Sequence, residues 1–196
     1  MPALRPDYVP SDGSCKSTIE WIRSQMEGDE LARTDFVTSG FTPSSLTEEF
    51  YRKALKDKNI FIREFFGADL KIRNAKVDYL NRALGRPDGT DRIDIPFEDD
   101  SLRPDDGMDQ DAVNKVFACD NLLERERMID NFLWEKADEI TRFDDFTLSS
   151  VLAVVAKLCI IQRWLALDAQ TGRQMLRTLV RDVRGTYGNI EFETLK

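Results

Sequence analysis

The residue types that most often carry out chemistry in proteins are sparse in this sequence. Histidine is absent, which removes the usual general base at neutral pH and the commonest metal ligand. The three cysteines, Cys15, Cys119 and Cys159, are odd in number, widely spaced and form no CxxC pair. This usage predicts a reduced, cytosolic protein rather than a disulfide framework or a zinc site.

The segment Gly13–Ser17 (GSCKS) is similar to the end of a phosphate-binding loop. That motif requires glycine directly before the lysine, so that backbone N–H groups can surround a phosphate, and here the position is Cys15. The first glycine of the motif would fall at Pro10, which has no N–H to donate. We therefore predict a plain turn and no nucleotide site.

Acidic residues suggest other sites, but no pattern is complete. The run 102–107 ends in Asp-Asp-Gly, as in part of an EF-hand loop, yet Leu102 and Pro104 would occupy the first and third ligand positions, which require oxygen donors. Carboxylates also occur in close pairs, as in Asp144 with Asp145 and Glu124 with Glu126. Such pairs are common on helix surfaces, and no nucleophile accompanies them. We predict no catalytic residue, no metal site and no cofactor.

Charge and hydropathy exclude two further classes. The net charge of −8 argues against nucleic acid as a partner, because phosphate-binding proteins usually display an excess of basic residues. The most apolar run, Val151–Ile161, contains Lys157 and is shorter than the roughly 20 residues that a bilayer requires. We therefore predict no direct membrane insertion. The first residues also lack the apolar core of a signal peptide.

The spacing of apolar residues predicts an all-α helical bundle. Residues 1–44 are expected to be loosely ordered, with one short helix that ends at Gly28 and a Thr-, Ser- and Gly-rich connector at 34–44. A helical segment follows over 45–86, with a capping box at Ser45–Glu48 and a break near Asn59. Residues 87–108 form an acidic loop in which three prolines prevent a continuous helix.

The C-terminal part, 109–196, is predicted to be a helical bundle that forms one compact domain with 45–86. Three helices are expected, at about 120–141, at about 147–165, and from an N-cap at Asp168 to Gly185. The middle one is apolar nearly all round and must therefore lie among the others. The tryptophans Trp21, Trp134 and Trp164 are expected in the core, although an exposed Trp134 would mark an interface hot spot.

Two neighbouring helical stretches carry opposite charge. Residues 120–145 hold nine acidic and four basic side chains, whereas 157–184 hold six basic and two acidic ones. These stretches could pair with each other, or they could meet charged surfaces of partners and steer docking. Arg125 and Glu126 lie close to the apolar stripe, which is consistent with a partly buried pair between them.

Several segments of the chain, taken in order, resemble one known family. They are Glu64–Asn74 (EFFGADLKIRN), Asn121–Asp130 (NLLERERMID), Trp134, Ile140–Phe146 (ITRFDDF), Ile161–Asp168 (IQRWLALD) and Thr171–Arg173 (TGR). The family is bacterial, long catalogued as of unknown function, encoded alongside V-type ATPase subunits, and similar to the C subunit of that machine, called d in the eukaryotic enzyme. The resemblance covers residues 45–185.

The resemblance implies a mechanical role. The C subunit is an all-helical funnel on the cytoplasmic face of the membrane, where it links the rotor shaft to the proteolipid ring during ATP-coupled ion transport. It therefore implies a non-catalytic, cytoplasmic, peripheral subunit of the inner membrane whose partners are the shaft and the ring. No sharp motif carries binding residues, and Arg125, Arg127, Arg163 and Arg173 are the residues we expect to form structural or interface pairs.

Two other functions fit the same residues. One is a free-standing helical adaptor that shares only packing motifs with the ATPase family. Its gene need not lie beside ATPase genes, so the neighbouring genes would separate it from a rotor subunit. The other is an enzyme that uses Asp or Glu with bound Mg²⁺, which would be stabilised on heating by divalent metals or nucleotides.

Overall fold

The predicted all-α class is confirmed. The computed structural model describes residues 4, 5, 8, 10, 14–96, 115–119, 121–144 and 146–166, and in these the regular structure is helical, with no strand. The helices are α1 (Lys16–Ser24), α2 (Gly28–Ser39), the short 3-10 helix η1 (Pro43–Ser45), α3 (Glu48–Leu55), α4 (Ile60–Leu84), α6 (Leu122–Ile140) and α7 (Leu148–Ala166). Residues 115–118 are also helical. The third predicted C-terminal helix, after Asp168, lies outside the described residues.

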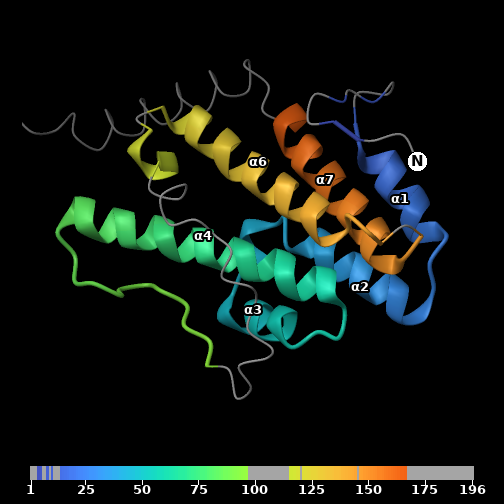
Figure 1. Cartoon of the computed structure of the whole chain (residues 1–196), viewed down its shortest axis with the longest axis horizontal. Helices are drawn as coiled ribbons and strands as arrows, with labels where there is room; N and C mark the ends of the chain where they lie inside the picture. The colour runs from blue at the N-terminus through green and yellow to red at the C-terminus, as the bar shows by residue number, and fades with distance from the viewer. Residues whose placement is uncertain are drawn as a thin grey trace, which may run out of the picture.

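The apolar helix α7 lies among the others, as its composition predicts. It contacts α1, α2, α4 and α6. The short loop 141–147 joins α6 to α7, and these two helices lie side by side next to the long helix α4, with α3 packed on α4 (Figure 1). Leu152, Val155 and Leu158 of α7 are almost completely buried. The core therefore lies where α7 meets α2, α4 and α6.

The prediction that no stretch has the length and composition of a membrane span is wrong for α7. Leu148–Ala166 is long and apolar enough, because the apolar run continues on both sides of Val151–Ile161. Here α7 is packed as a core helix, and 56% of its most apolar window is buried. Lys157, the buried one of its two charged residues, pairs with Asp138 of α6 and lies over the Trp134 ring, 5.0 Å from the centroid.

The predicted connector at 34–44 is wrong over its first half. Residues up to Ser39 belong to α2, so the segment 1–44 contains two α-helices rather than one, and Gly28 begins α2 instead of ending α1. Thr and Ser are tolerated because their hydroxyls bond to backbone carbonyls within the helix: Thr34 donates to Glu30 (2.9 Å) and Thr38 donates to Thr34 (2.9 Å). Packing against α7 then outweighs their weak helix propensity.

The break near Asn59 is confirmed, but the predicted capping box is misplaced by two residues. Ser45 lies in η1, and the N-cap of α3 is Thr47, whose hydroxyl accepts from the Phe50 N–H at 3.2 Å. Asn59 caps α4 by accepting from the N–H of Phe61 at 2.9 Å. Helix α4 then runs without interruption to a left-handed Gly85, the residue type favoured at such a C-terminus.

After α4 the chain is non-helical over 86–96, as predicted for the start of the loop 87–108, whose remainder lies outside the described residues. Two buried asparagines of α4 attach it to the helix. Asn74 donates to the Ile93 carbonyl at 2.9 Å and accepts from its N–H at 3.1 Å, and Asn81 donates to the Thr90 carbonyl at 2.8 Å. These side-chain hydrogen bonds satisfy backbone groups of 86–96 that have no partner in a helix or sheet.

The tryptophan predictions hold for two of three residues. Trp134 is buried, which removes it as an exposed hot spot, and Trp164 is partly buried against the core. Trp21 is 59% exposed, so its expected core position is wrong. The reason is that α1 buries only the face carrying Ile19 and Ile22.

Candidate functional site

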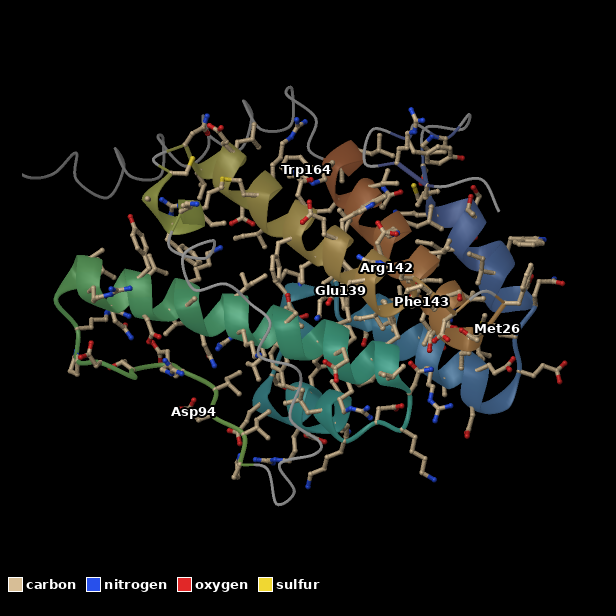
Figure 2. The ribbon with its side chains drawn as sticks, in the orientation of Figure 1. Met26, Asp94, Glu139, Arg142, Phe143 and Trp164 are labelled. Atoms are coloured by element: carbon tan, nitrogen blue, oxygen red, sulfur yellow. The ribbon has the colours of Figure 1, made fainter. Side chains whose placement is uncertain are left out.

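An aspartate on α6 connects that helix to the last turns of α7. Asp130 is buried, with one carboxylate oxygen paired to Arg163 and the other accepting from the Trp164 indole N–H at 2.7 Å. Arg127 in turn lies over the Trp164 ring, 5.1 Å from its centroid. The labelled Trp164 lies near the C-terminal end of α7 (Figure 2). We call Asp130, Arg163, Trp164 and Arg127 the α6–α7 lock.

A second acid lies near the lock. Asp69 on α4 accepts a hydrogen bond of 2.6 Å from the hydroxyl of Tyr51 on α3, and the Tyr51 side chain is completely buried. Arg163 and Asp130 both influence the Asp69 carboxylate electrostatically. Four helices, α3, α4, α6 and α7, therefore contribute to one polar region within the bundle.

Burial dominates the ionisation of both acids. The pKa of Asp69 is raised above its usual range by burial, and the Tyr51 hydroxyl and the charges of Arg163 and Arg73 oppose the rise. The pKa of Asp130 is also raised by burial, against the opposing effects of Arg163 and the Trp164 indole. The pKa of Tyr51 is raised too, chiefly by burial and then by the adjacent Asp69 charge.

Three of the four predicted arginines are described, and all three contact groups of the same chain. Arg163 and Arg127 belong to the α6–α7 lock. Arg125 donates to the Cys119 carbonyl at 2.7 and 3.2 Å and lies over the Tyr79 ring of α4, 5.1 Å from the centroid. Arg125 thereby fastens residues 115–119 to the bundle. Arg173 lies outside the described residues.

The expected pair between Arg125 and Glu126 does not form. Glu126 instead accepts from Lys76 of α4 at 2.8 Å, because successive helix residues point in different directions. Pairing between the oppositely charged stretches does occur where both are described, at Lys157 with Asp138 and at Arg163 with Asp130.

An open, charged groove of about 660 Å³ lies between α2 and α3, away from the two acids. Its lining comprises Asp29, Arg33, Glu49, Arg52, Lys53, Lys56, Asp57 and Lys58. Ion pairs occupy much of it, including Arg33 with Asp57 at 3.2 Å. In the part of the chain that the structure describes, no group of three or more His, Cys, Asp or Glu side chains is placed to hold a metal ion. Both perturbed acids are instead engaged by side chains of neighbouring helices, Asp69 by Tyr51 and Asp130 by Arg163 and Trp164.

The role of these two acids was not foreseen, although the sequence contains a signal. Asp69 falls between the buried Phe65 and Ile72 at helical spacing, and Asp130 precedes the buried Trp134 by one turn. An acid within a buried helical stripe requires an internal partner. The partners themselves come from other helices, so the fold is needed to identify them.

Comparison with known proteins gives one match. Residues 103–186, less than half of the chain, match the model of a family described as "Protein of unknown function (DUF2764)". No curated protein and no solved structure matches the chain. The matched range includes the α6–α7 lock and the loop between these helices.

Neutralising Asp69 should leave the protein folded and reduce the pH dependence of its stability. Between the usual Asp pKa of about 3.9 and the raised native value, the folded state binds more protons than the unfolded state, so stability falls as pH rises. In Asp69→Asn an amide oxygen still accepts from Tyr51, and we expect a free energy of unfolding unchanged or up to about 1 kcal/mol higher at pH 7.

Urea unfolding at pH 5 and pH 8 measures this effect. Asp35→Asn, which alters an exposed acid paired with Arg23, serves as the control and should leave the pH slope of the wild type. A loss above about 2 kcal/mol at pH 8 for Asp69→Asn would show that the charged form of Asp69 is the stabilising one.

Proposed function

We propose that the chain is a non-catalytic central-stalk subunit of a V-type ATPase or ATP synthase, a helical socket that links the rotor shaft to the membrane proteolipid ring. The observation that carries the proposal is the α6–α7 lock, together with the Tyr51–Asp69 bond. These contacts join α6 to α7 and α3 to α4 through buried, directional interactions. A part that transmits torque has to keep its shape under load.

The aromatic packing around α4 supports the same role. Phe66 is buried and meets Phe36, Phe50 and Phe65 with ring centroids 5.9, 4.9 and 5.3 Å away. Gly40 approaches so closely that a Cβ there would lie 2.4 Å from a Phe66 ring atom. Interiors packed this tightly deform little and pass displacement on.

The sequence segments add support of a different kind. The segments of the family resemblance that lie after residue 120 all fall inside the range matched by the family of unknown function. Glu64–Asn74 lies outside that range, on α4, where it contributes Phe65, Phe66, Asp69 and Asn74 to the contacts described above. Several residues of the resemblance therefore hold helices together.

Binding to the two expected partners tests the proposal. The whole chain, co-expressed with the shaft subunits and the proteolipid ring subunit of a V-type ATPase, should co-purify with at least one of them, with a Kd of about 1 µM or tighter. The isolated chain should show no ATP turnover. A tagged, unrelated helical protein of similar net charge is the control for non-specific capture.

Absence of binding to both partners, in a preparation whose folding is verified by circular dichroism, would contradict the proposal. Stabilisation of the isolated chain by Mg²⁺ with a nucleotide would instead indicate an enzyme.

A further inference from the structure

Helix α6 extends past the point at which α7 ends. The two helices are antiparallel, because Asp138 of α6 pairs with Lys157 of α7 and Asp130 pairs with Arg163. Helix α7 ends at Ala166, shortly after Arg163, whereas α6 begins about two turns before Asp130. The start of α6 therefore has no turn of α7 beside it, and Figure 1 shows that α6 and one end of α4 continue past the end of α7.

One exposed leucine lies on the side of α6 that α7 leaves uncovered. On this side Arg127 and Asp130 contact Trp164 in the last turn of α7. Leu123 precedes Arg127 by one turn, and residues four apart share a side of a helix. The Leu123 side chain is 56% exposed, because α7 ends before it reaches this turn of α6.

The seam between α4 and α6 carries two further exposed leucines. Lys76 pairs with Glu126 at 2.8 Å, and the two helices are antiparallel, since the next contact along α4 is with an earlier residue of α6. Leu80 follows Lys76 by one turn and Leu122 precedes Glu126 by one turn, so both lie on the faces that meet at this pair. Leu80 is 43% exposed and Leu122 is 64% exposed. We call Leu80, Leu122 and Leu123 the leucine strip.

The sequence that follows α7 is suited to cover the leucine strip. The residues after Ala166 lie outside the described part of the chain. The helix predicted there carries apolar side chains at intervals of three and four residues, namely Met175, Leu176, Leu179, Val180 and Val183. A helix over residues 173–184 is about 18 Å long, enough to cross leucines of two helices whose axes lie about 8–10 Å apart. Its apolar stripe requires an apolar surface to pack against.

The point at which α7 ends decides which exposed apolar surface this segment reaches. Residues 167–172 connect α7 to the segment and span about 20 Å when extended. The leucine strip begins within about one helical turn, or 5 Å, of the end of α7. Phe143 and Phe146, the most exposed apolar residues described, lie beyond the opposite end of α7, which is about 28 Å long, and are therefore out of reach.

We propose that the leucine strip is the docking surface for residues 173–184 of the same chain, with the apolar stripe of this segment packed on Leu80, Leu122 and Leu123. The segment then occupies, beside α6, the position that α7 leaves empty by ending at Ala166. The contact lies within one chain and does not rest on the proposed function. It also makes the strip unavailable to a second copy of the chain while the segment is bound.

Thiol labelling of the whole chain tests the contact. Leu123→Cys is introduced together with Cys119→Ser, and Trp21→Cys in the same background is the control, because Trp21 and Leu123 are similarly exposed in the described fold. A bound segment should slow maleimide labelling at position 123 by about tenfold or more relative to position 21. The start of a helix lowers the pKa of a thiol and speeds its reaction, so slow labelling at position 123 requires physical cover.

Charged residues in the segment should remove this protection. With Leu176→Asp and Val180→Asp, labelling at position 123 should accelerate by about tenfold, while the control position stays within about twofold, because carboxylates resist burial against leucines. The buried cysteines, Cys15 and Cys159, react only if the whole fold opens and therefore report that the variant is folded. Equal labelling at the two positions before the aspartates are added, or protection that the aspartates leave unchanged, overturns the inference.

A second measurement does not require the aspartates. Cysteines at positions 123 and 179, joined by a short bismaleimide in the Cys119→Ser background, should cross-link within one chain at least about tenfold faster than cysteines at 21 and 179. Equal rates for the two pairs would overturn the docking. A cross-link between two chains, or protection at position 123 that is lost on dilution, would assign the leucine strip to a second copy and would overturn it as well.

Discussion

Replacing Phe66 with alanine should lower the free energy of unfolding by about 3–5 kcal/mol, as expected for the loss of a buried aromatic side chain. Phe66 is 1% exposed and lies at the centre of rings contributed by α2, α3 and α4. Thermal or urea unfolding, followed by circular dichroism, measures the loss. Leu84→Ala, at an exposed position of the same helix, is the control and should change stability by less than about 0.5 kcal/mol.

A double-mutant cycle with Gly40 makes this prediction specific. Gly40→Ala alone should destabilise by about 1–3 kcal/mol, because the added Cβ would overlap the Phe66 ring. In the Phe66→Ala background the same substitution enters the vacated space, so the two losses should not add. Additive losses would show that the close approach of Gly40 to Phe66 is absent from the folded protein.

The sequence predicts the helices of this fold well where their apolar stripes are long. The apolar spacing in the sequences of α6 and α7 predicts the bounds of both helices to within about two residues, and the predicted segment 45–86 ends within two residues of the end of α4 at Leu84. The sequence fails at α2, whose Thr and Ser residues are typical of a connector. The reason is that packing against α7 and internal hydroxyl bonds outweigh local propensity there.

The candidate site is predicted less well than the fold. Arg163 was expected to form a structural or interface pair, but its partner, Asp130, lies 33 positions earlier on another helix. Arg125 was expected to pair with its neighbour Glu126, and it contacts a carbonyl and a ring instead. Sequence spacing shows which residues share a face of one helix, and it does not show which faces of two helices meet.

The loop between α6 and α7 shows that sequence spacing is equally limited in predicting which residues are exposed. Phe143 and Phe146 lie within a segment used for the family resemblance, and nothing in their spacing separates them from core phenylalanines. Their exposure follows from the point at which α6 ends and from the left-handed turn at Phe146. Only the fold shows that these two aromatic rings contact solvent, whereas Phe61 and Phe65 are buried.

Removing the positive charge of the α6–α7 lock should produce a stability loss that depends on pH. In Arg163→Met the carboxylate of Asp130, whose side chain is 4% exposed, keeps only the Trp164 indole as a partner among the described residues. We expect a loss of about 2–4 kcal/mol at pH 8, at the lower end of values for broken buried pairs because the Arg163 side chain is 44% exposed.

The loss should shrink as the pH falls. Burial already raises the pKa of Asp130, and removing Arg163 takes away an effect that lowers it, so the native pKa rises further. Between the usual Asp pKa of about 3.9 and this raised value, the folded state binds more protons than the unfolded state. Stability of the variant therefore increases on acidification across that window, more steeply than in the wild type.

Urea unfolding of Arg163→Met at pH 5 and pH 8 separates this mechanism from a simple loss of packing. Adding Asp130→Asn removes the unpaired charge and should restore at least half of the stability lost at pH 8, whereas Arg142→Met, at an exposed arginine of the neighbouring loop, should stay within about 0.5 kcal/mol of the wild type. An equal loss at both pH values, with no recovery in the double variant, would mean that Arg163 acts through its aliphatic stem. The buried charge of Asp130 would then not be what holds α6 against α7, and the rigidity argued for the proposed socket would have to come from apolar packing alone.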